Sequence, residues 1–122
     1  MAAGDKVMAT RPSAVAAIAG VAGAAGGAAT LGLSAPGAGY AWTVGMVRWG
    51  YDAAPTGGGV TVSDGTTSEA VPITAAGPGF MPYDPPIQFK DNGAVTITLA
   101  APGGSVVGKL GVSAWIQKAG GV

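Results

Sequence analysis

The chain has 122 residues, and its six basic and six acidic side chains leave it with no net charge at pH 7. Charged residues make up 10% of the sequence, against about 25% in ordinary soluble domains. Proteins that diffuse freely as monomers usually carry a charged surface and a net charge, because both oppose association. We therefore expect copies of the chain, or a larger assembly, to cover much of its surface. The alternative is a small domain kept soluble by Thr, Ser and Gly.

Several kinds of functional site are excluded by residue types that the sequence lacks. It contains no Cys and no His. Disulfides and thiolate metal sites are therefore excluded, and the commonest general base and transition-metal ligand is absent. Lys and Arg form no cluster, so the electrostatic footprint of a nucleic-acid-binding protein is missing. We predict a protein that is not an enzyme and has no cofactor, no metal and no nucleic-acid partner.

Carboxylates are the remaining candidates for chemistry. Asp52 and Asp84 each lie beside a tyrosine in an expected loop, so the two carboxylates are candidates for a shared catalytic pair. A glycosidase, however, needs two carboxylates that face each other across a cleft, one of them with a raised pKa. Asp64 and Asp91 are assigned to turns, since Asp side chains hydrogen-bond the local backbone. The segment 64–69 lacks the ligand spacing of a calcium loop, so no catalytic or metal-binding residue is predicted.

The N-terminal third is uncharged and rich in Ala and Gly. No charged residue lies between Arg11 and Arg48. Each Gly weakens a helix by about 1 kcal/mol relative to Ala, and large aliphatic residues are few. We therefore predict neither a signal peptide nor a transmembrane helix, and no membrane partner. Residues 1–27 are expected to form an extended arm with a short edge strand at 14–18, which packs on a neighbouring subunit or is a flexible tail.

Short strands separated by turn residues are predicted for a sandwich domain at 28–117, followed by a flexible tail at 118–122. The first strand covers 28–34, and the longest covers 40–52. Along the longest strand the apolar positions switch from even to odd numbers. The switch indicates a β-bulge near Gly45, or two halves that face different layers.

The middle of the predicted domain contains a hairpin and an edge segment. Residues 60–63 and 70–74 form the hairpin around an Asp-Gly turn, whose residues tolerate a positive φ. The segment 80–86 has too many prolines for a central strand and is placed at an edge. A short strand follows at 87–90.

A period-two pattern near the C-terminus is the strongest signal for β-structure. Val95, Ile97 and Leu99 alternate with Thr, and after turn residues at 101–105 the apolar residues continue at even positions over 110–116. This pattern predicts two half-buried antiparallel strands. About eight short strands and no helix indicate an all-β fold, an antiparallel β-sandwich or jelly roll. The predicted core is Leu31, Leu33, Trp42, Val44, Val47, Val60, Val62, Val71, Ile73, Phe80, Ile87, Phe89, Val95, Ile97, Leu99, Leu110, Val112, Ala114 and Ile116.

The aromatic side chains exceed what so small a core can bury. Trp49 and Trp115 fall opposite the faces assigned to the interior, so we expect them to point outward. Outward indoles are typical of protein–protein interfaces, where Trp and Tyr are enriched. A sugar-stacking platform is the alternative, with Arg48 and Gln117 as the only obvious polar partners.

Beyond Ala28, the order of features resembles the capsid decoration, or cement, proteins of tailed-phage heads. The residues that carry the resemblance are segments 40–59, 60–65, 73–80, 92–101 and 106–112. The resemblance implies homotrimers on the capsid lattice that bridge neighbouring major capsid proteins and resist internal pressure. It carries no catalytic residue over to this chain, and related sandwiches occur in phage tails and fibres.

The predicted function is therefore that of a structural virion protein on the capsid surface. Its expected partners are its own copies, as a trimer, and the major capsid protein. The alternative is a carbohydrate-binding or adhesin-like module of a phage tail or fibre. The predicted interface residues are Met8, Arg11, Val15, Ile18, Val21, Arg48, Trp49, Tyr51, Tyr83 and Trp115.

Overall fold

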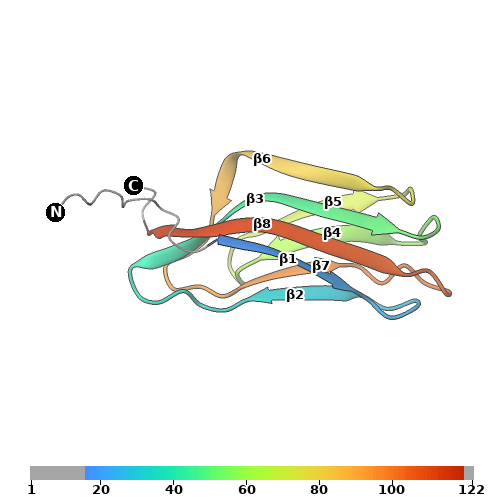
Figure 1. Cartoon of the computed structure of the whole chain (residues 1–122), viewed down its shortest axis with the longest axis horizontal. Helices are drawn as coiled ribbons and strands as arrows, with labels where there is room; N and C mark the ends of the chain where they lie inside the picture. Colours follow the sequence, from blue (N-terminus) through green and yellow to red (C-terminus); the bar gives the residue numbers. More distant parts are fainter. Residues whose placement is uncertain (1–15, 120–122) are drawn as a thin grey trace.

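The computed structural model describes residues 16–119, which form eight β-strands and, within that range, no helix (Figure 1). The strands are β1 (Ala16–Ala22), β2 (Ala29–Leu33), β3 (Tyr40–Tyr51), β4 (Gly58–Ser63), β5 (Ser68–Ile73), β6 (Gly79–Gln88), β7 (Val95–Leu99) and β8 (Gly108–Lys118).

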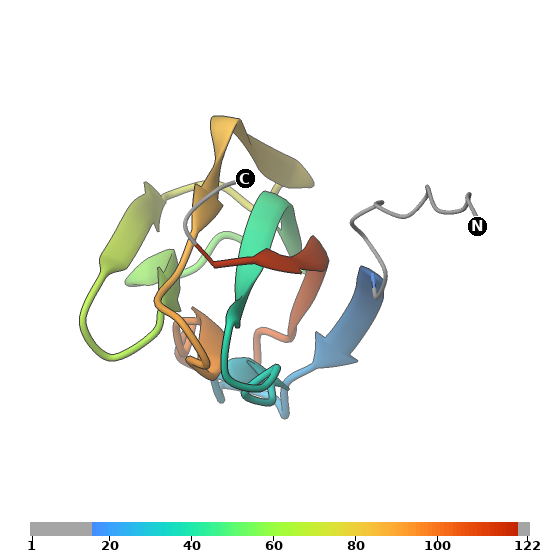
Figure 2. The ribbon, with the colours of Figure 1, turned by 90° about the vertical axis from the view of Figure 1, so that its left-hand side faces the viewer.

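Two four-stranded sheets form the two layers of a sandwich, which Figure 2 shows from one end. The first sheet has the order β1-β8-β3-β6, and the second has the order β2-β7-β4-β5. Neighbouring strands pair antiparallel throughout both sheets. The predicted antiparallel β-sandwich of eight strands is confirmed.

The core lies between the two sheets and follows the alternation of the strands. Val95, Ile97 and Leu99 of β7 are fully buried, and Thr96 between them is exposed. The side chains of a strand point to opposite faces in turn, so the apolar set of each strand enters the core together. Most of the predicted core residues are buried, and Val71, Ile87 and Ile116 pack against the core in partly buried positions. Phe80 is the exception, because its side chain is 64% exposed.

A β-bulge in β3 explains the change of apolar parity along the longest strand. The pairing of β3 with both β6 and β8 shifts between Val44 and Met46. Val44 before the shift and Val47 after it are both fully buried. The extra residue therefore moves the inward-facing positions from even to odd numbers while β3 stays in one sheet. The bulge predicted near Gly45 is confirmed.

Three details of the predicted strands are corrected. β7 and β8 are not paired with each other, because the segment 100–107 carries the chain from the second sheet to the first. Of the segment predicted as a separate strand at 87–90, residues 87 and 88 belong to β6, which ends at Gln88, and residues 89 and 90 lie outside the strands. The edge strand predicted at 14–18 within the arm extends further than expected, because β1 runs on to Ala22 and pairs with β8 along its seven described residues.

Candidate functional site

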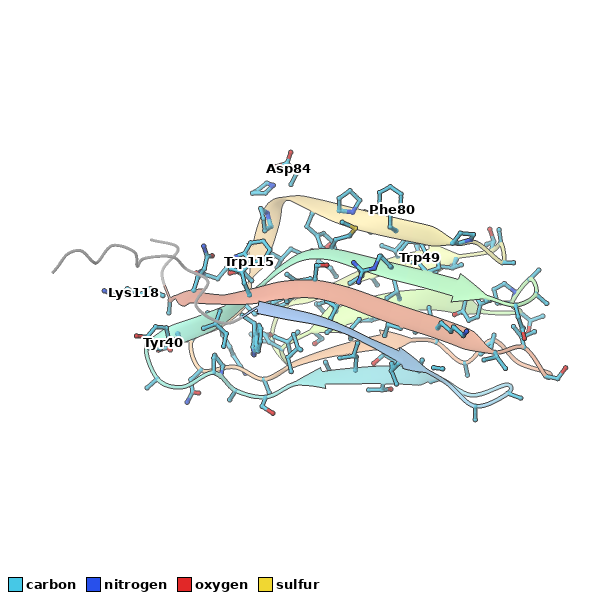
Figure 3. All side chains as sticks on the ribbon, in the orientation of Figure 1. Tyr40, Trp49, Phe80, Asp84, Trp115 and Lys118 are labelled. Atoms are coloured by element: carbon cyan, nitrogen blue, oxygen red, sulfur yellow. The ribbon has the colours of Figure 1, made fainter. Side chains whose placement is uncertain are left out.

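The outer face of the first sheet carries an apolar groove near one end of the sandwich. Arg48 of β3 lies opposite Phe80 of β6 and Gly111 of β8, so these three residues form one row across the sheet. Figure 3 shows Phe80 standing on β6 away from the sandwich. The groove has a volume of about 820 Å³. Its lining residues are Met46, Arg48, Trp49, Gly50, Pro78, Gly79, Phe80, Lys109, Leu110 and Gly111.

The charge of this groove is positive. Arg48 and Lys109 are its only charged lining residues, and no acidic residue lines it. The Nη1 of Arg48 donates a hydrogen bond of 2.9 Å to the Oγ of Ser113. A β-carbon on Gly111 would lie 3.1 Å from Nη2 of Arg48, so the missing side chain at Gly111 makes room for the guanidinium on the sheet face. Arg48 thus lies on the outer face, where a partner can reach it.

Trp49 lies on the inner side of the sheet, against the expectation that it points outward. Its indole packs against the core and covers Gly79, where a β-carbon would fall 2.7 Å from the ring. The bulge is the physical reason, because Val47 and Trp49 share their parity on its far side. Trp49 is half-buried and supports the groove from below.

Tyr51 belongs to the core and is excluded as an outward interface residue. It is 6% exposed, and its hydroxyl donates a hydrogen bond of 2.9 Å to the carbonyl oxygen of Ala100. Burial raises the pKa of the Tyr51 phenol. Tyr51 also lies on the inward parity that follows the bulge, with Val47.

Tyr83 of β6 is partly buried and packs against the core. Within residues 16–119, its buried hydroxyl has no hydrogen-bond partner. Burial, followed by the negative charge of Glu69, raises the pKa of the Tyr83 phenol. Its ring therefore packs against the core from the inner face of β6, and an interface role for Tyr83 stays a prediction.

Trp115 lies on the outer face of the first sheet, as expected, toward the end opposite Phe80 (Figure 3). Its ring covers Gly45 at the bulge, where a β-carbon would be 2.8 Å from Cζ3. The indole is half-buried by this contact. Beside it, the Oγ1 of Thr43 donates a hydrogen bond of 2.8 Å to Oε1 of Gln117.

The N-terminal interface candidates divide into two groups. Met8, Arg11 and Val15 lie outside the described residues. Ile18 lies in β1, of which only the backbone is described at this position, and Val21 is partly buried against the core. The interface roles of Arg48 and Trp115 stay predictions, now with a defined outer face.

Phe80, like Trp49, is a groove residue that lies on the opposite side of the sheet from the one predicted. The predicted core includes Phe80, within the edge segment at 80–86, yet its side chain is exposed. Asp84 on the same strand is exposed, and Phe80 shares its even parity. That shared parity was the signal that could have placed Phe80 outside.

The carboxylates do not form the shared pair that can be drawn from the sequence. Asp52 follows the end of β3 that pairs with Gly79, whereas Asp84 lies five residues further along β6. At about 3.3 Å per strand residue, at least about 15 Å separates them.

The described part of the chain has no cluster of three or more potential metal-ligating side chains. Nor does it hold a helix of the length and hydropathy needed to cross a membrane.

Comparison with known proteins gives similarity of architecture only. No model of a known protein family matches the sequence, and no curated protein does. One similar solved structure is the carbohydrate-binding module TmCBM61 in complex with β-1,4-galactotriose, at 13% identity and a TM-score of 0.39. The alignment covers 75% of this chain and 61% of the module, so the chain spans less than two thirds of that protein.

A second similar structure is the virus-like particle protein of the extra small virus of the giant freshwater prawn Macrobrachium rosenbergii. Its identity is 17% and its TM-score is 0.33, and the alignment covers 83% of this chain and 78% of the viral chain. At these values, neither structure carries a functional argument for this protein.

Proposed function

We propose that the chain is a non-catalytic structural protein of a tailed-phage virion. In this proposal it lies on the outer capsid surface, binds the major capsid protein and its own copies, and stabilises the head. The groove around Phe80 is the observation that carries the proposal. A phenylalanine that is 64% exposed and lines an open apolar groove of this size is typical of a surface that a protein partner covers.

The chemistry of the groove specifies the partner segment. Because the only charged lining residues are Arg48 and Lys109, the best complement is an apolar segment flanked by Asp or Glu. Phe80 is the expected anchor, since buried aromatic residues dominate the binding energy of interfaces. Full burial of its ring is worth about 1.5–3 kcal/mol, which corresponds to roughly a ten- to hundredfold change in affinity.

Co-sedimentation with capsid shells tests the proposal. The shells are assembled from the major capsid protein of the phage that encodes this chain, and the full-length chain is added at micromolar concentration. We expect the wild type to pellet with the shells and the Phe80→Ser variant to bind at least tenfold more weakly. Tyr40→Ser is the matched control, because Tyr40 is 50% exposed but does not line the groove. Equal binding of the wild type and Phe80→Ser contradicts the proposed docking surface.

A carbohydrate-binding module is the second candidate, supported by the half-buried indole of Trp115 on the outer face. The polar groups near this indole bond to one another, Arg48 to Ser113 and Thr43 to Gln117. Fewer donors and acceptors are therefore left for sugar hydroxyls. Binding to a glycan array that is lost in Trp115→Ala would favour this candidate over the structural role.

A further inference from the structure

The four edge strands of the sandwich differ in how they are protected. β6 and β5 are the edges at one side, and β1 and β2 are the edges at the other. β6 carries Pro82, Pro85, Pro86 and Asp84, and β5 carries Pro72 and Glu69. Proline and charge are the usual means by which proteins prevent an edge from pairing with another strand.

The edge at β1 lacks both kinds of protection. Its seven residues, AAIAGVA, include no proline and no charge. Within residues 16–119, β8 is its only neighbour in the sheet, and Figure 2 shows β1 in blue on the outer side of β8. An unprotected edge of this length is a template for an additional strand.

The hydrogen-bond parity of β1 shows which backbone groups face outward. The N–H of Gly23 donates to the carbonyl of Gly108 over 2.9 Å, in register with the ladder between β1 and β8. Bonded positions alternate along an antiparallel ladder, so the odd-numbered residues of β1 bond to β8. The even-numbered residues therefore direct N–H and C=O away from the sheet: Ala16, Ile18, Gly20 and Ala22.

The neighbouring edge strand β2 has fewer residues whose backbone groups face outward. The N–H of Ala100 donates to the carbonyl of Gly59, so even-numbered residues of β7 bond to β4 and odd-numbered residues bond to β2. Leu31 pairs with Ile97 in this ladder. Only Thr30 and Gly32 of β2 therefore direct their backbone groups outward, against four such residues in β1.

We propose that β1 pairs antiparallel with β1 of a second copy of this chain across a two-fold axis beside Ala19. In this register Ala16 pairs with Ala22 of the second copy, and Ile18 pairs with Gly20. The outward-facing backbone groups of all four residues then lie opposite outward-facing backbone groups of the second copy. The four hydrogen-bonded pairs supply about eight N–H···O=C bonds. The two first sheets join into one continuous sheet.

Charge favours a second copy as the occupant. A strand with no charged residue offers no counter-charge to an acidic or basic peptide, whereas two copies of β1 do not repel each other. The nearest charge on the neighbouring strand is Lys109, which pairs with Ala22. In the joined sheet the two β8 strands are three strand spacings apart, about 14 Å. This separation exceeds the Debye length of about 8 Å at physiological ionic strength.

Sedimentation analysis of the full-length chain tests the pairing. At tens of micromolar we expect a particle of twice the 11.6 kDa chain mass. Gly20→Pro removes one outward N–H and no bond to β8, and the space beside Gly20 is limited only by the carbonyl of Leu110 at 3.4 Å. We expect this variant to dissociate at least tenfold more readily. Gly32→Pro on β2 is the matched control, because it also removes an outward N–H and should leave the dimer intact.

A second variant and an amide-exchange measurement test the pairing even if Gly20→Pro fails to fold. Gly20→Lys places a charge at the same edge without proline, and should also weaken the dimer if Gly20→Pro fails to fold. Amide exchange should show protection of Ile18, Gly20 and Ala22 that rises with protein concentration. A monomeric wild type, a particle of three times the chain mass, or equal masses for wild type and Gly20→Pro would overturn the pairing.

The pairing goes beyond the proposed function and does not depend on the groove. Phe80→Ser should remain dimeric while losing capsid binding. Gly20→Pro should become monomeric and keep an intact groove. The two proposals can therefore fail separately.

Discussion

Asp64 at the end of β4 accepts a hydrogen bond of 2.9 Å from the backbone N–H of Lys90. Its other carboxylate oxygen accepts bonds from the N–H groups of Thr66 and Thr67, at 2.8 and 2.6 Å. A single carboxylate thus holds the β4–β5 hairpin against the segment that follows β6. Its turn role is confirmed. Asp91, by contrast, bonds to the distant Gly39 and not to its own turn.

Asp64→Ala should lower the free energy of unfolding by about 2–3 kcal/mol, because three N–H groups lose a charged acceptor. Asp84→Asn is the control, since Asp84 is exposed and should change stability very little. Urea unfolding monitored by tryptophan fluorescence measures both. An Asp64→Ala variant as stable as Asp84→Asn would show that the three bonds do not hold the hairpin.

Acid should remove the contribution of Asp64. Burial opposes its ionisation, but bonds from the N–H groups of Thr67, Lys90 and Thr66 and the Lys90 ammonium together lower the Asp64 pKa. The carboxylate therefore stabilises the fold above the unfolded-state pKa of about 3.9. This stability is lost as the pH falls through the lower folded-state pKa. The difference in melting temperature between wild type and Asp64→Asn should be largest near neutral pH and shrink below about pH 3.9; a constant difference would refute this.

Tyr51→Phe should cost about 1 kcal/mol of stability, because the carbonyl of Ala100 loses its partner inside the sandwich. Tyr40→Phe removes the same atom from a residue that is 50% exposed and should have almost no effect. Denaturant unfolding compares the pair. Equal losses for the two variants would mean that the buried hydroxyl makes no useful bond.

Gly79→Ala should displace the indole of Trp49, since the new β-carbon would fall 2.7 Å from the ring. We expect a loss of about 1–3 kcal/mol and a shift in tryptophan emission. Gly32→Ala is the control, because nothing lies within 4 Å of a β-carbon at that position. It should be neutral or stabilising by about 0.5–1 kcal/mol. A stable Gly79→Ala variant with unchanged emission would contradict the described packing.

Phe80→Ser should leave the free energy of unfolding within about 0.5 kcal/mol of the wild type, since an exposed side chain makes few contacts within the chain. Thermal unfolding checks this prediction and also validates the variant as a probe of docking. A large loss of stability would mean that Phe80 supports the fold of the chain.

The faces of the strands could be predicted from the sequence, but their partners could not. Val95, Ile97 and Leu99 alternate strictly, and the structure buries all three. Alternation assigns a side chain to a face and says nothing about the neighbouring strand. For that reason the placement of β7 and β8 in different sheets was not predicted. The parity change in β3 was readable because only an inserted residue moves the apolar positions from even to odd.

The residues of the candidate site were harder to predict from the sequence than the faces of the strands. Tyr51 and Trp49 were expected at an interface because aromatic residues are common there, yet the bulge turns both toward the core. Phe80 belongs to the predicted core, although its parity with the exposed Asp84 places it on the outer face. The two larger side chains of β1, Ile18 and Val21, fall at even and odd positions and set no period of two, so the sequence does not show that β1 pairs with β8.

The proposed docking of the groove against a capsid is tested most directly by a cryo-electron microscopy map of the virion in which the proposed function places this chain. We predict density for the sandwich on the outside of the head, with Phe80 buried against the major capsid protein. A particle without the chain, or a map in which Phe80 faces solvent, would contradict the account.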